Sequence, residues 1–265
     1  MQFLDGLDSD IKRSVLCQLR DLWTYTSTGL EGNTLSLGDT QFVLSEGLTI
    51  SGKPIKDHQE VIGHAKAIEL IYALVGQPLM QPAVFDLHKA VQTEHISDIY
   101  KPYGAYKKEP NGTYAVTEDN KQVFIEYALP SAVESLMTQW IDWLNVATKA
   151  GVTMHNAAAI YAQAHMGFVH IHPFFDGNGR LARLLANLPL LASGLPPIVI
   201  AREARQPYLK CLSEYQLQAG QLTTKTGVWP KEPKCLEPFT DFISQQYHHT
   251  QCLLDNAHKQ HNNRR

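Results

Sequence analysis

Apolar residues recur at intervals of three and four along most of the chain, which is the spacing of one face of an α-helix. The clearest stripe follows Pro130 and comprises Val133, Leu136, Met137, Trp140, Ile141 and Leu144. Similar stripes predict helices over about 9–25, 35–47, 57–75, 83–93, 154–170, 202–218 and 236–254, and a further helix that begins near residue 176. The pattern therefore predicts an all-α protein in which most helices bury one face.

One segment departs from the helical pattern. Residues 99–127 carry several tyrosines in short alternating runs, with Asn111-Gly112 between them. Asn-Gly suits the left-handed backbone of a tight turn and is a strong local signal for a β-hairpin. We therefore predict a hairpin whose turn lies at 110–112, and without further context it reads as an ordinary surface hairpin.

Composition and charge restrict the class of protein. The 265 residues are 44% hydrophobic, enough to bury the core of one large domain, alone or with a small appendage. The net charge of -3 shows no basic footprint for nucleic acid. The most apolar window, 181–201, contains Arg183 and prolines and does not suit a membrane span. Scattered cysteines and an N-terminus without signal-peptide features lead us to expect reduced thiols and a cytoplasmic protein.

The stretch from His172 to Arg183 reads HPFFDGNGRLAR and carries the candidate chemistry. Its first half predicts a loop, and an apolar stripe predicts a helix that starts at Asp176, the expected N-cap. The small residues Gly177-Asn178-Gly179 leave the first backbone amides of that helix accessible, and unpaired amides at a helix N-terminus attract anions. Arg180 and Arg183 share one helical face and are suited to phosphate oxygens. The combination predicts a polyphosphate site.

Two further side chains extend this interpretation. Asp176 beside such a site suits Mg²⁺, which prefers one or two carboxylates together with phosphate oxygens. His172, with an ordinary pKa near ~6.5, is suited to accept a proton from a hydroxyl group. Taken singly, each residue has an ordinary reading as a cap, a turn or a packed or solvated side chain. His165 and His170 lie five residues apart, which is not the spacing of a helical zinc site, so zinc is not expected.

The same stretch fits the signature H-x-F-x-[DE]-G-N-G-R-x-x-R at every fixed position, so the chain resembles the Fic family over about residues 60–242. The resemblance implies a Fic-type helical bundle with a β-hairpin flap, and transfer of AMP from ATP to a Tyr, Thr or Ser hydroxyl of a protein. It assigns the general base to His172, Mg²⁺ to Asp176, and nucleotide contacts to Gly177, Asn178, Gly179, Arg180, Arg183 and Tyr208. Gly104-Ala105-Tyr106-Lys107 resembles the flap motif G-x-Y-R, with Lys107 in place of Arg, and the flap would hold the target by adding a strand.

Residues 27–32 resemble the family's inhibitory motif [ST]-x-x-x-E-[GN], with Ser27 and Glu31 at its fixed positions. By composition alone Glu31 is an exposed acid at a helix end, where Gly32 or Asn33 provides a C-cap. The resemblance implies that Glu31 pairs with Arg183, so that Arg183 cannot grip the γ-phosphate and ATP is misaligned for attack. It also makes Glu31 a candidate to position a water molecule for removal of AMP.

The expected organisation is a set of N-terminal helices over 1–56, a Fic core over 57–245 with its flap at about 99–127, and a helix end over 246–265 with a polar tail that frays from His258. Gln216 and Gln218 stand where relatives often carry Asn, which leaves the choice of base open. Alternatives are transfer of UMP, phosphocholine or phosphate, or a nucleotide-sensing interaction module with vestigial chemistry. We expect a protein substrate and modification of the chain by itself. Partners that are nucleic acids or membranes are not expected. The sequence does not decide whether the protein forms a homodimer.

Overall fold

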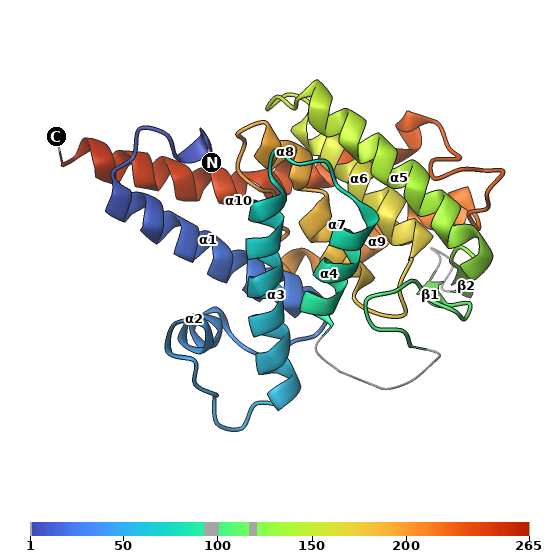
Figure 1. The fold of residues 1–265 in the computed structure, drawn as a ribbon, viewed down its shortest axis with the longest axis horizontal. Helices are drawn as coiled ribbons and strands as arrows, with labels where there is room; N and C mark the ends of the chain where they lie inside the picture. The colour runs from blue at the N-terminus through green and yellow to red at the C-terminus, as the bar shows by residue number, and fades with distance from the viewer. Residues whose placement is uncertain (1, 93–100, 117–120, 265) are drawn as a thin grey trace.

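The computed structural model describes residues 2–92, 101–116 and 121–264, which form a helical body with one small hairpin (Figure 1). This arrangement confirms the predicted all-α class with a hairpin. The elements, in chain order, are η1 (Gln2–Leu4), α1 (Ser9–Leu30), α2 (Leu37–Glu46), α3 (Ile55–Leu74), α4 (Gln81–Val91), β1 (Gly112–Val116), β2 (Gln122–Glu126), α5 (Pro130–Ala150), α6 (Ala157–Ile171), α7 (Asn178–Leu185), α8 (Leu188–Ala192), η2 (Arg202–Ala204), α9 (Arg205–Ala219), η3 (Pro233–Leu236) and α10 (Glu237–Asn262).

Helix α6 lies at the centre of the body and contacts α5, α7 and α10. Its alanines, including the fully buried Ala162 and Ala164, let neighbouring helices approach closely. The buried indole Nε1 of Trp140 on α5 donates a hydrogen bond to the Ala164 carbonyl at 2.8 Å. Because α6 ends directly at the signature stretch, this packing fixes where that stretch begins.

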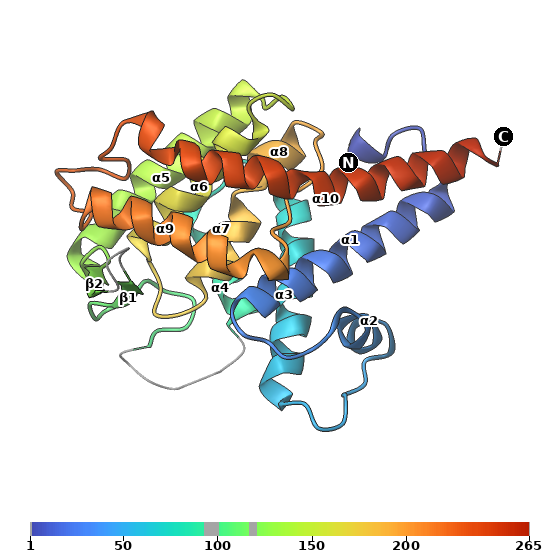
Figure 2. The same cartoon turned by 180° about the vertical axis from the view of Figure 1, so that it is seen from behind.

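Helices α1 and α10 run side by side and extend away from the body at the end where both termini lie (Figure 2). Their contact is a small apolar cluster of Leu4, Leu7, Ile11, Val15, Leu254 and Ala257. The predicted fraying from His258 is wrong, because α10 continues to Asn262. Its last turns keep a buried face, and the Nδ1 atom of His261 lies 3.0 Å from the Asp8 carboxylate.

The predicted hairpin is present, but its turn is not at Asn111-Gly112. Strands β1 and β2 pair antiparallel from Gly112 opposite Glu126 to Val116 opposite Gln122, so the connection runs through 117–121. Gly112 begins β1, where a Cβ atom would overlap the Ile125 carbonyl oxygen and the Phe124 ring. Within the expected flap, residues 99–100 and 117–120 lie outside the described residues, as does Thr93 of the predicted 83–93 helix.

Helix α1 is longer than its apolar stripe predicted and ends at the candidate inhibitory motif. Glu31 is its C-cap, and Gly32 follows with a left-handed φ of +103°. The Nε atom of Arg205 donates to the Leu30 carbonyl at 2.8 Å, and Nη2 of Arg202 donates to the Asn33 carbonyl at 3.0 Å. The end of α1 is therefore fastened to the start of α9.

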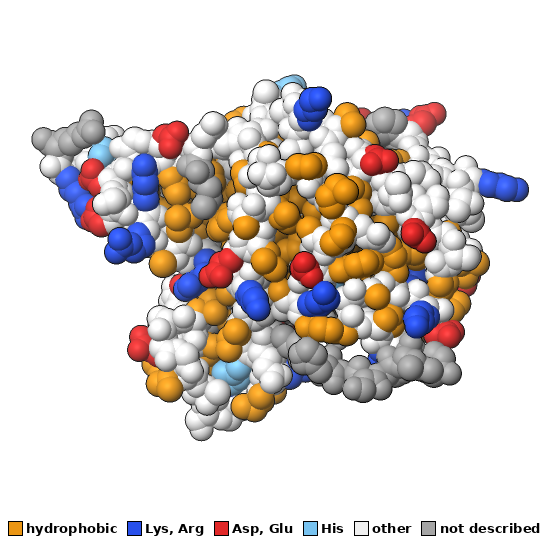
Figure 3. Space-filling view, viewed as in Figure 1, with side chains coloured by type: hydrophobic (Ala, Val, Ile, Leu, Met, Phe, Trp, Pro, Cys, Tyr) orange, Lys and Arg blue, Asp and Glu red, His pale blue; other side chains and the backbone are white. Residues whose placement is uncertain are grey.

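No helix in the described part of the chain has the length and apolar character needed to cross a membrane. On the face shown in Figure 3, acidic and basic side chains are interspersed rather than gathered by sign.

Candidate active site

The signature loop is shaped from within by Asn178. Its Oδ1 accepts from the Phe174 backbone N–H and its Nδ2 donates to the Phe174 carbonyl, both at 2.9 Å. Phe174 is fully buried and its ring stacks on that of His88 at a centroid distance of 4.0 Å. The Asn178 side chain is thus committed to the loop, and its backbone amide is the group available to an anion.

The N-cap of helix α7 lies one residue later than expected, so Asp176 does not cap the helix. The N-cap is Gly177, whose φ of +81° is left-handed and suits glycine, and no side chain caps the helix. Asp176 instead leaves its carboxylate 56% exposed, with Oδ2 3.4 Å from Nη2 of Arg180. The first amides of a helix have no intrahelical partner, so this N-terminus retains its capacity for an anion.

His172 ends α6 and, among the described residues, is the non-glycine residue with a positive φ, at 53°. Its Nδ1 lies 3.2 Å from the Val169 carbonyl oxygen, and its ring stacks on Tyr127 with centroids 3.8 Å apart. Because a carbonyl only accepts, Nδ1 carries the hydrogen and Nε2 keeps a free lone pair. Burial lowers the pKa of His172 to about 3, and the nearby charge of Lys107 acts in the same direction, so the imidazole is neutral near pH 7.

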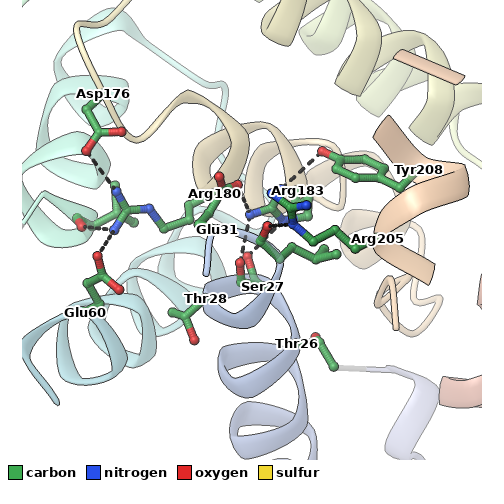
Figure 4. Close-up of polar contacts among 12 residues, drawn as sticks. Thr26, Ser27, Thr28, Glu31, Glu60, Asp176, Arg180, Arg183, Arg205 and Tyr208 are labelled. Carbon is green, nitrogen blue, oxygen red and sulfur yellow. Dashed lines mark hydrogen bonds and ion pairs between the residues drawn. The ribbon is translucent and has the colours of Figure 1, made fainter. Parts of the chain in front are cut away.

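Arg183 and Glu31 form the expected pair, with Arg183 Nη2 2.6 Å from Glu31 Oε1 (Figure 4). Ser27 contributes two more acceptors, its Oγ at 3.0 Å from Nε and its carbonyl oxygen at 2.9 Å from Nη2. Nη1 donates to the Tyr208 hydroxyl at 3.1 Å, and that hydroxyl lies 3.0 Å from Nε2 of His165. Arg183, whose side chain is 2% exposed, is therefore held on every side by the protein.

Arg180 points away from Arg183, although the two are three residues apart (Figure 4). Its Nη1 donates to the Val91 carbonyl at 3.0 Å and lies 3.8 Å from Glu60 Oε1, while Nη2 faces Asp176. The expectation of one shared phosphate-binding face is therefore wrong for this conformation. A buried guanidinium group needs partners, and the two arginines find theirs on different neighbouring helices.

The Glu31 carboxylate also covers the first turn of α7. A Cβ atom on Gly179 would overlap Oε1 of Glu31 and would approach Nη1 of Arg183 to 3.1 Å. The absence of a side chain at Gly179 is what lets the carboxylate approach so closely. The protein's own carboxylate lies where the free amides of α7 favour an anion.

The four residues of the expected flap motif lie ahead of the strands, packed on α4 and the signature loop. The Gly104 backbone N–H donates to Nδ1 of His88 at 3.0 Å, and the Tyr106 ring contacts Phe85 with centroids 4.9 Å apart. The Lys107 backbone N–H donates to the Pro173 carbonyl at 2.9 Å, and burial lowers the pKa of its amine to about 7. Ala105 lies between Gly104 and Tyr106, so all four residues of the motif lie against α4 and the signature loop rather than in the strands.

A cavity of about 360 Å³ lies between β1 and α9. Its lining includes Thr113, Tyr127, Val169, Gln206, Leu212 and Gln216. Tyr127, which stacks on His172, separates the cavity from the imidazole, since His172 is not among the lining residues. Gln216 is 3% exposed, and its Nε2 has no hydrogen-bond partner in the described structure, which leaves an amide donor at the cavity wall. Tyr208 is not among the lining residues and lies behind Arg183 instead.

Asp176 suits a metal ion that arrives with phosphate. Within the described residues no group of three or more His, Cys, Asp or Glu side chains gathers as a preformed metal site. Mg²⁺ needs only one or two carboxylates when phosphate oxygens complete its coordination. Asp176 meets that requirement, since it is exposed at a cavity of about 110 Å³ lined by His88, Gln92 and Phe175.

Two residues that shape the site, Tyr127 and Glu60, were not predicted from the sequence. Tyr127 follows β2 directly, and nothing in the local pattern indicates that its ring stacks on His172. Glu60 offered a signal, because Asp57 and Glu60 lie three apart on the face of α3 that also carries Val61 and His64, and all four are buried. Carboxylates on a buried helical face usually have a specific partner.

Comparisons with known proteins identify the family and the fold. The Fic/DOC family profile matches residues 78–190. A solved Fic domain containing signaling protein from Bacteroides thetaiotaomicron is 30% identical, with a TM-score of 0.82 over 97% of this chain and 93% of that one. Fic-1 from Caenorhabditis elegans is 26% identical, with a TM-score of 0.73 over 97% of this chain and 69% of the solved one. The chain belongs to the Fic family.

Among curated relatives, protein adenylyltransferase fic-1 from Caenorhabditis briggsae is 34% identical over 194 residues. The match takes in 72% of this chain and 36% of that protein. The chain therefore spans about a third of the length of the curated relatives that it matches.

Proposed function

We propose that this protein is an adenylyltransferase that transfers AMP from ATP to a Tyr, Thr or Ser hydroxyl of a protein. The observation that carries the proposal is the contact of His172 Nδ1 with the Val169 carbonyl oxygen, which leaves the Nε2 lone pair to accept a proton. His172 stands at the start of the loop that leads to α7, whose N-terminus no side chain caps. The acceptor oxygen attacks the α-phosphorus as Nε2 takes its proton, and the bond to the β-phosphate oxygen breaks. Pyrophosphate then leaves. The names of the curated relatives support this reaction.

The phosphates would be held by the backbone amides of Gly177, Asn178 and Gly179 together with Arg183. Arg180 would act from the Asp176 side, where it already contacts that carboxylate. Asp176 would hold Mg²⁺, which when bound neutralises charge on the phosphate oxygens. The 360 Å³ cavity would take the nucleoside, and the Gln216 amide, which can both donate and accept, would face the base.

Glu31 would act as a brake on this reaction. Its carboxylate both neutralises Arg183 and covers Gly179, so a γ-phosphate cannot reach the guanidinium group or the first turn of α7 while Glu31 stays in place. The salt bridge is backed by two acceptors of Ser27, which makes the paired state specific. ATP would then enter in a pose that is misaligned for attack.

The hairpin would receive the protein substrate. Tyr114 and Phe124 are 65% and 52% exposed, and their rings pair at a centroid distance of 5.1 Å. An extended segment that adds to a strand of this hairpin would bring its hydroxyl toward His172, because Tyr127, which follows β2, stacks on that imidazole. A segment of a second copy of this chain would serve equally, which would allow self-modification.

Mass spectrometry of the Glu31→Gly protein after incubation with ATP and Mg²⁺ tests the proposal. We expect one added adenylyl group on a Tyr, Thr or Ser side chain, and little or none on wild type. Glu46→Gly is the matched control. It removes an acid from the end of α2 that shares no described contact with Arg183, and it should behave as wild type. Parallel incubations with UTP and CDP-choline identify a different transferred group. ATP binding without any mass change would instead indicate a nucleotide-sensing module.

Removal of AMP is a second candidate activity, favoured by the position of Glu31. Its side chain is 42% exposed and sits at the phosphate site, where it could orient a water molecule toward a phosphorus atom. Wild-type protein incubated with a modified target should then release AMP, and Glu31→Gly should not. Failure of wild type to release AMP from its true target would reject this activity.

A further inference from the structure

The guanidinium group of Arg180 is divided between two carboxylates. Asp176 Oδ2 lies 3.4 Å from Nη2 and Glu60 Oε1 lies 3.8 Å from Nη1, so neither contact is as short as the 2.6 Å pair of Arg183 and Glu31. The anchor of Arg180 is the Val91 carbonyl at 3.0 Å. Asp176 is the exposed member of this group and Glu60 the buried one (Figure 4).

Glu60 is fixed from its other side by the turn that follows Glu31. Its Oε2 accepts from Nδ2 of Asn33 at 3.0 Å, and the same Nδ2 donates to the Asp57 carbonyl at 2.9 Å. Asn33 Oδ1 accepts from the Leu35 backbone N–H at 3.0 Å. A continuous set of polar contacts therefore runs from the turn after Glu31, through Glu60 and Arg180, to Asp176.

We propose that Glu60 is a positioning residue: its buried charge shares Arg180 with Asp176, limits how tightly Arg180 holds that carboxylate, and so keeps Asp176 available to a metal ion that accompanies the nucleotide. The proposal rests on the function proposed above, in which Asp176 holds Mg²⁺. Glu60 itself touches neither nucleotide nor metal. It acts only by competing with Asp176 for one guanidinium group.

The consequence of removing this charge follows from the two distances. In Glu60→Gln, Asp176 keeps its carboxylate near Arg180 while the other described carboxylate partner is lost. The 3.4 Å contact should then shorten, and the Asp176 oxygens should be less available to Mg²⁺. Loss of a group that orients a metal ligand typically weakens metal affinity by ~10–100-fold. We expect a rise of about tenfold in the Mg²⁺ concentration at half-maximal effect.

Asp57 provides a matched control from the preceding turn of α3. It is as buried as Glu60 and its carboxylate also holds the turn after Glu31, because Oδ2 accepts from the Thr34 backbone N–H at 2.8 Å and from its hydroxyl at 2.6 Å. Asp57 makes no contact with Arg180 in the described structure. Asp57→Asn therefore loosens the same turn without freeing Arg180.

The experiment uses full chains that carry Glu31→Gly, so that the site is open. Binding of a fluorescent ATP analogue is titrated with Mg²⁺, and transfer is measured separately by mass spectrometry. The Mg²⁺ midpoint should rise about tenfold in Glu60→Gln and stay unchanged in Asp57→Asn. Folding of each variant is checked by thermal unfolding without nucleotide. If Glu60→Gln does not fold, Glu60→Asp replaces it. Glu60→Asp keeps the charge but shortens its reach, and should also raise the Mg²⁺ midpoint.

An unchanged midpoint in a folded Glu60 variant overturns the proposal, as does an equal rise in Asp57→Asn, which would indicate a general loosening of α3. The two claims fail separately. If the midpoint shifts as expected but no variant transfers AMP, Glu60 positions Asp176 and the proposed transfer is wrong. If transfer occurs and the midpoint does not move, only the role of Glu60 is rejected.

Discussion

The Oε1 atom of Glu31 lies 2.6 Å from Nη2 of Arg183, and the same oxygen fills the space that a Cβ on Gly179 would need. One carboxylate thus neutralises the buried guanidinium group and covers the first turn of α7. Its position depends on α1 running on to Leu30 and on the fastening of that end by Arg202 and Arg205. In the proposed function, release of the site therefore requires the Glu31 carboxylate, whose side chain is 42% exposed, to leave Arg183.

Ser27→Ala should release Glu31 partially. The substitution removes the acceptor at 3.0 Å from Arg183 Nε but keeps the Ser27 carbonyl, so the paired state should lose about 0.5–1.5 kcal/mol. We expect auto-modification with ATP that is higher than in wild type and lower than in Glu31→Gly, measured by the incorporation of label. Thr28→Ala removes a hydroxyl that bonds within α1, to the Thr24 carbonyl, and is the matched control. Equal labelling of the two variants would contradict the role of Ser27.

His172→Ala in the Glu31→Gly background should bind ATP and fail to transfer AMP. A general base typically contributes ~10²–10⁴-fold to the rate, and the imidazole makes no contact in the described structure that would hold a phosphate. Labelling of the protein and binding of a fluorescent ATP analogue should be measured on the same sample. Normal labelling would refute the assignment of the base, and loss of both binding and labelling would show a structural rather than a chemical role.

Gly179→Ala should abolish nucleotide binding in the Glu31→Gly background, where no carboxylate meets the new methyl group and the fold should be at least as stable. Alanine favours the helix over glycine by about 1 kcal/mol, and the Glu31 oxygen that the methyl group would displace is the far end of a flexible side chain. The methyl group remains at the first turn of α7, the proposed phosphate site, after Glu31 is removed. Glu31→Gly/Gly179→Ala should therefore bind ATP far more weakly than Glu31→Gly, with an unfolding midpoint that is unchanged or higher. Tight ATP binding by the double variant would show that the first turn of α7 is not the phosphate site.

The sequence predicted most of the helices and the presence of a hairpin because these depend on local patterns. Apolar stripes mark buried faces, and the signature places His172, Gly177 and Arg183 at fixed intervals. What it could not predict depends on contacts between distant segments. The continuation of α10 to Asn262 depends on packing against the N-terminal segment, although the tail is polar in sequence.

The directions of the two arginines illustrate the same limit. Their three-residue spacing predicts a shared face, and only the placement of Glu31 on α1 and Glu60 on α3 shows that they diverge. Asn111 was likewise predicted to form a turn with Gly112. In the fold its Nδ2 donates to the Phe174 carbonyl at 3.2 Å, a partner 63 residues away. A local propensity gives way where a side chain finds a buried partner far along the chain.

Acidification from pH 6.5 toward pH 4 should destabilise the protein, because burial lowers the pKa of His88 and of His170 to about 4 from an ordinary value of 6.5. In that window the unfolded chain binds protons that the folded chain excludes. The free energy of unfolding therefore decreases as the pH is lowered, by up to ~1.4 kcal/mol per pH unit for each group. His170→Gln should flatten the fall, since it does not titrate and keeps a donor for the Gly220 carbonyl, 2.9 Å from His170 Nε2. Urea unfolding at several pH values measures the slope. His258→Gln, on the exposed side of α10, is the control and should follow wild type. Identical slopes of unfolding free energy against pH in all three proteins would contradict a neutral, buried His170.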